Sequence, residues 1–245
     1  MRPDNREWNV FRPVEMIPGF HRASEGSVLY RAGGTVVLCT ASIDNKVPPF
    51  LEGKGKGWLT AEYQMHPRAN PPRRESRDGR GKAPSGRTQE IQRLIGRALR
   101  AAVHLDKLGE RTIAIDCDVL EADGGTRTAS ITGGFVAVAI ALAKIGAAVV
   151  REPIAATSAG ILPDGSLALD LMYLEDSKAE VDLNVVATTS GKIVEIQGTA
   201  EGAPVERKEI DKLVDLGLEG IRQLGEIQKK TLVAAGVDLD SLLLK

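Results

Sequence analysis

The sequence predicts an α+β fold in which helices cover one face of a mixed sheet. Runs of aliphatic and β-branched residues with alternating polarity predict strands, and Gly- or Pro-containing turns join several of them into hairpins. Three longer segments with a helical period interrupt these runs, an order typical of α+β proteins. No linker clearly separates two domains, so residues 1–245 are expected to form a single domain.

Composition indicates a soluble globular protein with an aliphatic core. Hydrophobic residues make up 42% of the chain but aromatic residues only 4%, so Val, Ile, Leu and Ala must fill the interior. Cys39 and Cys117 lie in apolar runs without metal-binding or redox spacing, and we expect both to be buried and reduced. The polar start MRPDNREW contains no apolar signal-peptide region, which favours a cytoplasmic protein.

The first expected elements are three strands. Residues 27–30 and 35–42 form a hairpin across Gly33 and Gly34, and residues 58–63 form a strand after the Pro/Gly-rich connection 47–57.

A strongly basic segment follows these strands. Residues 66–100 contain ten positive and three negative side chains, a net charge of +7. Residues 67–86 are typical of a long loop, whereas residues 87–104 have a helical period. A single arginine here is most simply a solvated side chain, but the whole block favours a polyanion such as nucleic acid. Because the block lacks aromatic residues, we expect backbone contacts without base stacking.

The start of this helix provides a separate indication of an anion. Ser85 or Gly86 is the expected cap, which places Arg87 in the first turn. A cation is unfavourable at that end of the helix dipole unless an anion is bound there.

The stretch 121–130, EADGGTRTAS, is the strongest candidate for a phosphate site. An alternating strand at 112–120 precedes it, and an apolar helix at 131–149 follows it. A glycine-rich turn before a helix gathers free backbone N–H groups around an anion, and Arg127 offers a guanidinium suited to phosphate oxygens. The alternative is a helix capped by Thr128 or Ser130, with Arg127 solvated.

The expected helix 131–149 is almost long enough to span a bilayer. It contains Lys144 and three glycines, however, and lacks aromatic anchors. A buried helix is therefore favoured over a membrane span.

The remainder of the chain is expected to hold four strands, a helix and a tail. The strands are 153–162, 166–171, 181–188 and 192–198, with turns at 163–165 and 190–191. Residues 206–232 form an amphipathic helix, and residues 238–245 are expected to be a loosely attached tail.

Carboxylates cluster between these strands. If Asp176 ends the loop before strand 181–188, it can fold back beside Asp182. Such a pair suits Mg²⁺, with water and substrate phosphate completing the coordination, or one member can be held protonated as a general acid. The alternative is a solvated acidic loop. The full cluster is Asp170, Glu175, Asp176, Glu180 and Asp182.

Taken together, these features predict phosphoryl transfer on a polyanionic substrate. The chain offers no Ser–His or Cys–His pair to propose as a nucleophile, and it contains no GxxxxGK[ST] motif, so a nucleoside triphosphatase is disfavoured.

The same motifs resemble the bacterial ribonuclease PH family along essentially the whole chain. The resemblance is carried by MRPDNR at the start, CTASI at 39–43, VPPFLEGKGKGWLTAEYQMHPRA at 47–69, SGRTQEIQRLIGRALR at 85–100, IDCDVLEADGGTRTASITGG at 115–134, EDSKAEVDLNVV at 175–186 and EIQGTAEG at 195–202. It implies a two-layer α/β sandwich, also seen in GHMP-type kinases. It also implies a phosphate-dependent 3′→5′ exoribonuclease that trims tRNA precursors as a ring-shaped homohexamer, a trimer of dimers.

The resemblance also implies roles for individual residues. It gives Arg87, Gly125, Thr126 and Arg127 the binding of inorganic phosphate, with Arg127 also catalytic, and it gives Asp176 and Asp182 the Mg²⁺ and acid–base roles. Relatives that carry this domain inside a larger phosphorylase have a lysine where this chain has Asn184. Arginines of the basic segment are expected to contact RNA or a neighbouring subunit; they are Arg68, Arg73, Arg74, Arg77, Arg93 and Arg97.

Two functions from different classes follow from these residues. The first is phosphorolysis, in which bound phosphate attacks the last phosphodiester of RNA and releases a nucleoside 5′-diphosphate. The second is a catalytically silent RNA-binding ring subunit, which would be expected to lack one or more of Arg127, Asp176 and Asp182, all present here.

Overall fold

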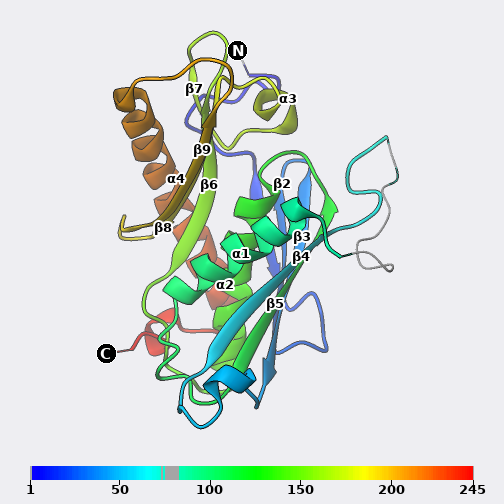
Figure 1. The fold of residues 1–245 in the computed structure, drawn as a ribbon, viewed down its shortest axis with the longest axis vertical. Coiled ribbons are helices and arrows are strands. Elements are labelled where there is room, and N and C mark those ends of the chain that lie inside the picture. The colour runs from blue at the N-terminus through cyan, green and yellow to red at the C-terminus, as the bar shows by residue number, and fades with distance from the viewer. Residues whose placement is uncertain (1, 73, 75–82, 245) are drawn as a thin grey trace.

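The strands form two separate sheets in the computed structural model, which describes residues 2–72, 74 and 83–244. One sheet has five strands in the order β1-β2-β3-β5-β4, and the other has four in the order β7-β6-β8-β9 (Figure 1). The predicted mixture of sheet and helix is confirmed, but the expected single sheet is divided in two.

The five-stranded sheet is antiparallel except for the parallel pair β4 and β5. On β5, Ile113, Ile115 and Cys117 point into the core and alternate with more exposed residues, which is why this strand could be predicted. Strand β1 was not predicted because it is short and only Met16 in it is fully buried. The strands are β1 (Val14–Pro18), β2 (Gly26–Ala32), β3 (Thr35–Asp44), β4 (Trp58–Met65) and β5 (Thr112–Glu121).

The four-stranded sheet is antiparallel throughout. Every residue of β6 is buried, because this central strand packs against both α2 and α4. Its strands are β6 (Ile154–Ile161), β7 (Leu167–Leu169), β8 (Val181–Thr188) and β9 (Ile193–Ala200).

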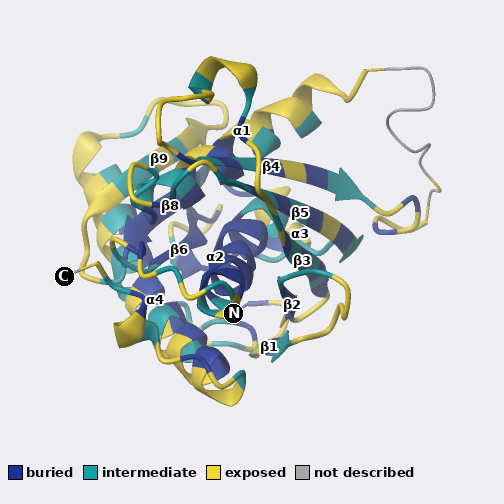
Figure 2. Ribbon diagram, turned by 90° about the horizontal axis from the view of Figure 1, so that it is seen from below, coloured by how far each residue is buried: buried dark blue, intermediate teal, exposed yellow. Residues whose placement is uncertain are grey.

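Helix α2 lies between the two sheets and is buried on nearly all sides (Figure 2). It is long and apolar enough to cross a membrane by length and composition, yet 78% of that apolar window is buried inside the protein. The prediction of a buried core helix is thus confirmed. The helices are α1 (Gly86–Ala101), α2 (Thr126–Lys144), the short α3 (Tyr173–Asp176) and α4 (Arg207–Ala234), with 3-10 turns η1 (Pro49–Leu51) and η2 (Leu239–Ser241).

Helix α2 begins and ends five residues earlier than predicted. Gly125 has a left-handed φ of 69° and forms the N-cap, so helical geometry starts at Thr126. Gly146, with φ 66°, ends the helix at the other side. Arg127 therefore lies in the first turn of α2 rather than in a loop before it.

The C-terminal tail is attached to the core, contrary to the prediction. Leu242 is only 3% exposed, and the backbone N–H of Val150 donates to its carbonyl oxygen at 2.9 Å. The apolar residues 242–244 supply the contacts that the prediction overlooked. By contrast, Cys39 and Cys117 are free and buried, as predicted, and the structure places them opposite each other on β3 and β5.

Candidate active site

The glycine-rich turn and the first turn of α2 form a cradle of backbone N–H groups. Gly124 and Gly125 have φ values of 76° and 69°, a conformation that favours glycine. A Cβ on Gly124 would lie 2.4 Å from the carbonyl oxygen of Leu171, so only glycine allows this close approach. The N-cap Gly125 has no side chain to satisfy the first N–H groups of the helix, which leaves them available to an anion.

A cavity of about 360 Å³ opens at this cradle and is lined by all six residues predicted for phosphate binding and catalysis. The phosphate residues come from the N-termini of α1 and α2, whereas the carboxylates come from α3 and β8. The six residues are Arg87, Gly125, Thr126, Arg127, Asp176 and Asp182.

The two arginines approach the cavity from the first turns of two helices. Ser85 is the cap of α1, and its hydroxyl accepts from the N–H of Thr88 at 3.1 Å, which fixes Arg87 in the first turn. Arg127 is the second residue of α2, and its Nη1 donates to Oε1 of Gln197 at 3.4 Å. Neither first turn contains an acidic residue. The partial positive charge at the N-terminus of each helix is therefore not neutralised by a side chain of its own first turn.

Both carboxylates have raised pKa values, and Asp176 is the more exposed of the two. Burial raises the pKa of Asp182 to about 6, with a further contribution from the neighbouring charge of Asp176. Burial also raises the pKa of Asp176, although the positive charges of Arg127 and Arg87 work in the opposite direction. Both carboxylates line the same cavity, so Asp176 folds back toward Asp182 as the sequence predicted.

These carboxylates fit a hard divalent cation. Oδ1 of Asp182 is buried and has no hydrogen-bond partner among the described residues, so it has an unused acceptor. A cation held by one or two carboxylates, with water and phosphate as further ligands, is the arrangement typical of Mg²⁺. Within the described part of the chain, no group of three or more His, Cys, Asp or Glu side chains is placed to hold a metal.

Of the three other carboxylates in the predicted cluster, Glu180 is exposed, whereas Asp170 and Glu175 are committed to ion pairs. Asp170 is held by Arg12, with Nη2 to Oδ1 at 2.7 Å, and Glu175 is held by Arg2, with Nε to Oε1 at 2.7 Å. Both acids are buried, so neither forms part of a solvated acidic loop.

Tyr63 lies near the site and was not predicted from the sequence. Its hydroxyl lies 2.9 Å from Oγ1 of Thr126, and the side chain reaches this position from β4 through the core. Burial raises the pKa of Tyr63, so the phenol keeps its proton. The alternation of β4 predicts that Tyr63 points inward, but only the structure shows which residue it meets.

Of the six arginines predicted to contact RNA, none that the structure describes lines the cavity. Arg68, Arg74 and Arg93 are exposed, whereas Nε of Arg97 forms an ion pair with Glu195 at 3.0 Å. Arg73 and Arg77 lie outside the described residues. An RNA-binding role for these six remains a prediction.

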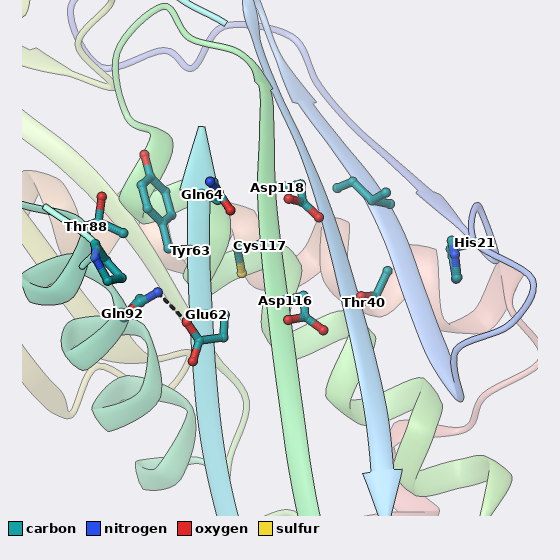
Figure 3. Close-up of a pocket in the computed structure, with 12 residues that line it drawn as sticks. His21, Thr40, Glu62, Tyr63, Gln64, Thr88, Gln92, Asp116, Cys117 and Asp118 are labelled. Atoms are coloured by element: carbon teal, nitrogen blue, oxygen red, sulfur yellow. Dashed lines mark hydrogen bonds between the residues drawn. The ribbon is translucent and has the colours of Figure 1, made fainter. Parts of the chain in front are cut away.

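A second hollow, of about 460 Å³, lies on the outer face of β3, β4 and β5 (Figure 3). Glu62, Asp116 and Asp118 line it, and Nε2 of Gln92 donates to Oε2 of Glu62 at 2.5 Å. Burial raises the pKa of Asp116, and the charge of Asp118 adds to this effect. Three carboxylates make this hollow unsuited to a phosphate, in contrast to the cavity at α2.

Two family models match the chain. Domain 1 of the 3′ exoribonuclease family matches residues 10–144, and domain 2 matches residues 152–220. Ribonuclease PH of Geobacillus sp. is 54% identical, covering 98% of this chain and 96% of that protein. Ribonuclease PH of Bacillus pumilus is 55% identical, covering 94% and 97%.

Solved structures with this fold are more distant in sequence. Rice Rrp46 has a TM-score of 0.77 at 16% identity, covering 94% of this chain and 100% of that chain. A subunit of the Archaeoglobus fulgidus exosome, solved with RNA bound to the active site, has a TM-score of 0.75 at 22% identity, covering 92% and 91%. These likenesses show a shared fold.

Proposed function

The chain belongs to the 3′ exoribonuclease family, and from this premise we infer that it is a phosphate-dependent 3′→5′ exoribonuclease. Near-complete coverage of relatives named Ribonuclease PH supports this function over a silent RNA-binding subunit. The structural observation that carries the proposal is a single cavity shared by Arg87, Thr126, Arg127 and two carboxylates.

The reaction uses inorganic phosphate in place of water. Arg87, Arg127, the hydroxyl of Thr126 and the N–H groups of the glycine-rich turn bind orthophosphate. An oxygen of this phosphate attacks the last phosphodiester phosphorus of the RNA, and the bond from phosphorus to the 3′ oxygen breaks. The 3′ oxygen takes up a proton, and the terminal nucleoside leaves as a 5′-diphosphate.

Two phosphate groups must approach each other in this reaction, and the site has to offset their repulsion. Two arginines and the positive ends of two helices supply fixed positive charge on one side. We propose that Asp176 and Asp182 hold Mg²⁺ on the other side, where the ion would offset charge on the transferring group. The pair carries both the metal-binding and the acid–base roles, and the proton for the 3′ oxygen comes from one of its two members.

We also propose the substrate, the assembly and the location. The substrate is the 3′ end of tRNA precursors, the assembly is a homohexameric ring built as a trimer of dimers, and the protein is cytoplasmic. The basic segment at 66–100 and the family membership support the first two, since exosome subunits share the fold. Sedimentation of the full chain tests the ring: a particle of one or two subunits would contradict it.

The proposed reaction is tested by its products. RNA with a labelled 3′ nucleotide is incubated with the protein and Mg²⁺, with and without phosphate, and the products are separated. We expect nucleoside 5′-diphosphate only when phosphate is present, and the reverse addition of nucleotides when diphosphates are supplied. Release of 5′-monophosphate without phosphate would show hydrolysis, and salt-dependent RNA binding without release would show a silent subunit.

A further inference from the structure

Residues 2–12 pack beside the candidate active site, at the end of the molecule that holds β7 and α3 (Figure 1). Arg2 is only 2% exposed and lies among carbonyl oxygens and one carboxylate. Its Nε and Nη2 donate to the two carboxylate oxygens of Glu175, each at 2.7 Å, and its Nη1 donates to the carbonyl of Leu169 at 2.8 Å. Such a bidentate pair fixes the direction of both side chains.

The acid in this pair directly precedes the candidate catalytic Asp176. Both belong to α3, which has only four residues and is too short to be stable without tertiary contacts. Glu175 is 3% exposed, and the contacts that hold it therefore decide where the next residue points. Since a buried ion pair contributes little net stability, its defined geometry is the feature that requires explanation.

The same N-terminal segment also contacts the phosphate cradle. Nε and Nη2 of Arg12 donate to Asp170 at 2.9 and 2.7 Å. Its Nη1 donates to the carbonyl oxygen of Asp123, and its Nη2 to that of Gly124 at 3.4 Å. One short segment thus reaches the carboxylate half of the site through Arg2 and the phosphate half through Arg12.

We propose that residues 2–12 are a positioning segment for the active site, in which Arg2 fixes Asp176 through Glu175 and Arg12 fixes the phosphate turn. The inference rests on the proposed function of Asp176. A purely structural role would lower stability alone, whereas a positioning role changes catalysis in protein that is fully folded. The two arginines should also affect different kinetic constants.

Arg2→Lys and Glu175→Gln test the first contact in the full chain. Lysine keeps the charge but loses the bidentate geometry, and glutamine keeps the volume of Glu175. At a temperature where circular dichroism shows both variants folded, we expect kcat of phosphorolysis to fall about tenfold to a hundredfold, the range caused by misplacement of about 1 Å. We expect KM for phosphate to stay within about twofold, because the contacts of Arg12 are unchanged.

Arg12→Lys should show the opposite pattern, with a larger rise in KM for phosphate than loss of kcat. Arg222→Lys is the matched control, because Arg222 pairs with Glu219 on the exposed face of α4. Wild-type kcat in folded Arg2→Lys and Glu175→Gln would overturn the positioning role. Asp176→Asn separates the failure of the proposed function from the failure of the positioning role. If Asp176→Asn stays active, the catalytic assignment of Asp176 is wrong. If Asp176→Asn is inactive while the Arg2 variants are fully active, only the positioning inference fails.

Discussion

The phosphate half and the carboxylate half of the candidate site rely on different chemical groups. The phosphate half consists of a glycine turn and the first turn of the 19-residue helix α2, so backbone N–H groups form much of it. The carboxylate half consists of side chains on the four-residue helix α3 and on β8, and Oδ1 of Asp182 there lacks a partner among the described residues. The first half is complete before a ligand arrives, whereas the second holds negative charge that a ligand must offset.

This difference predicts opposite relations between activity and stability. Changes to the backbone of the phosphate half, such as those at Gly124, should lower both, because the same turn holds the fold and binds the anion. Removal of the Asp182 charge in the carboxylate half should lower activity but raise stability, because a partly buried charge is unfavourable until a cation or proton offsets it.

The largest expected effect is the loss of Arg127. Arg127→Ala removes one preorganised charged donor from the cavity, and we expect the rate of phosphorolysis to fall on the order of a hundredfold or more. Nucleoside diphosphate release at saturating RNA measures it, with Arg222→Ala on α4 as a control of the same chemistry away from the cavity. A loss below about threefold would show that Arg127 does not contact the transferring phosphate.

The pH dependence of stability tests the carboxylate half. The folded pKa of Asp182 is about 6, above its ordinary value of 3.8, so folding favours the neutral acid. Its contribution to stability is present below about pH 4 and is lost as the pH rises through about 6, a change of roughly 3 kcal/mol. In urea unfolding, Asp182→Asn should match the wild type near pH 4 and exceed it at pH 7, while phosphorolysis is lost.

Mg²⁺ provides the control for this prediction. The ion should stabilise the wild type at pH 7 but have little effect on Asp182→Asn, because the ligand is gone. Equal stabilisation of both proteins would show that the cation binds elsewhere. If Asp182→Asn is less stable than the wild type at pH 7, the carboxylate of Asp182 stabilises the fold. The two halves of the site would then not differ in how activity relates to stability.

Gly124→Ala tests whether the phosphate half depends on backbone shape. The new Cβ would lie 2.4 Å from the carbonyl of Leu171 at a φ of 76°, so both contact and conformation are unfavourable. We expect a loss of about 2 kcal/mol in the free energy of unfolding and a higher KM for phosphate. Gly191→Ala is the control, because Gly191 has a φ of 93° with no atom within 4 Å. Equal effects in both variants would assign the loss to conformation alone.

Most elements of the fold could be predicted because their signals are local. The alternation on β5, the hairpin at Gly33 and the period of α4 each arise from neighbouring residues. The limits of α2 were wrong because glycines, rather than the apolar pattern, set its ends. The tail was misjudged because a short apolar run gives no sign of what it packs against.

The site could be predicted in part for the same reason. Arg87 and Arg127 follow from the chemistry of helix starts, and the pair of aspartates from the local spacing of acids. The ion pairs of Arg2 and Arg12 could not be predicted, since their partners lie 173 and 158 residues away in the chain. A single sequence does not show which distant charges form ion pairs. Buried acids such as Glu175 therefore could not be distinguished from the acids of a solvated loop.

Tyr63→Phe should have the smallest effect on stability and activity, and it tests whether the phosphate half is preformed. It removes only the hydroxyl that lies 2.9 Å from Oγ1 of Thr126, so unfolding should become easier by about 1 kcal/mol. If the phosphate half is preformed, the freed Thr126 should also raise KM for phosphate about fivefold or less, at nearly constant kcat. Urea unfolding and phosphate titration measure the two effects. A fall in kcat with unchanged KM would mean that this hydroxyl acts only in the transition state, and the phosphate half would then not be complete before the reaction begins.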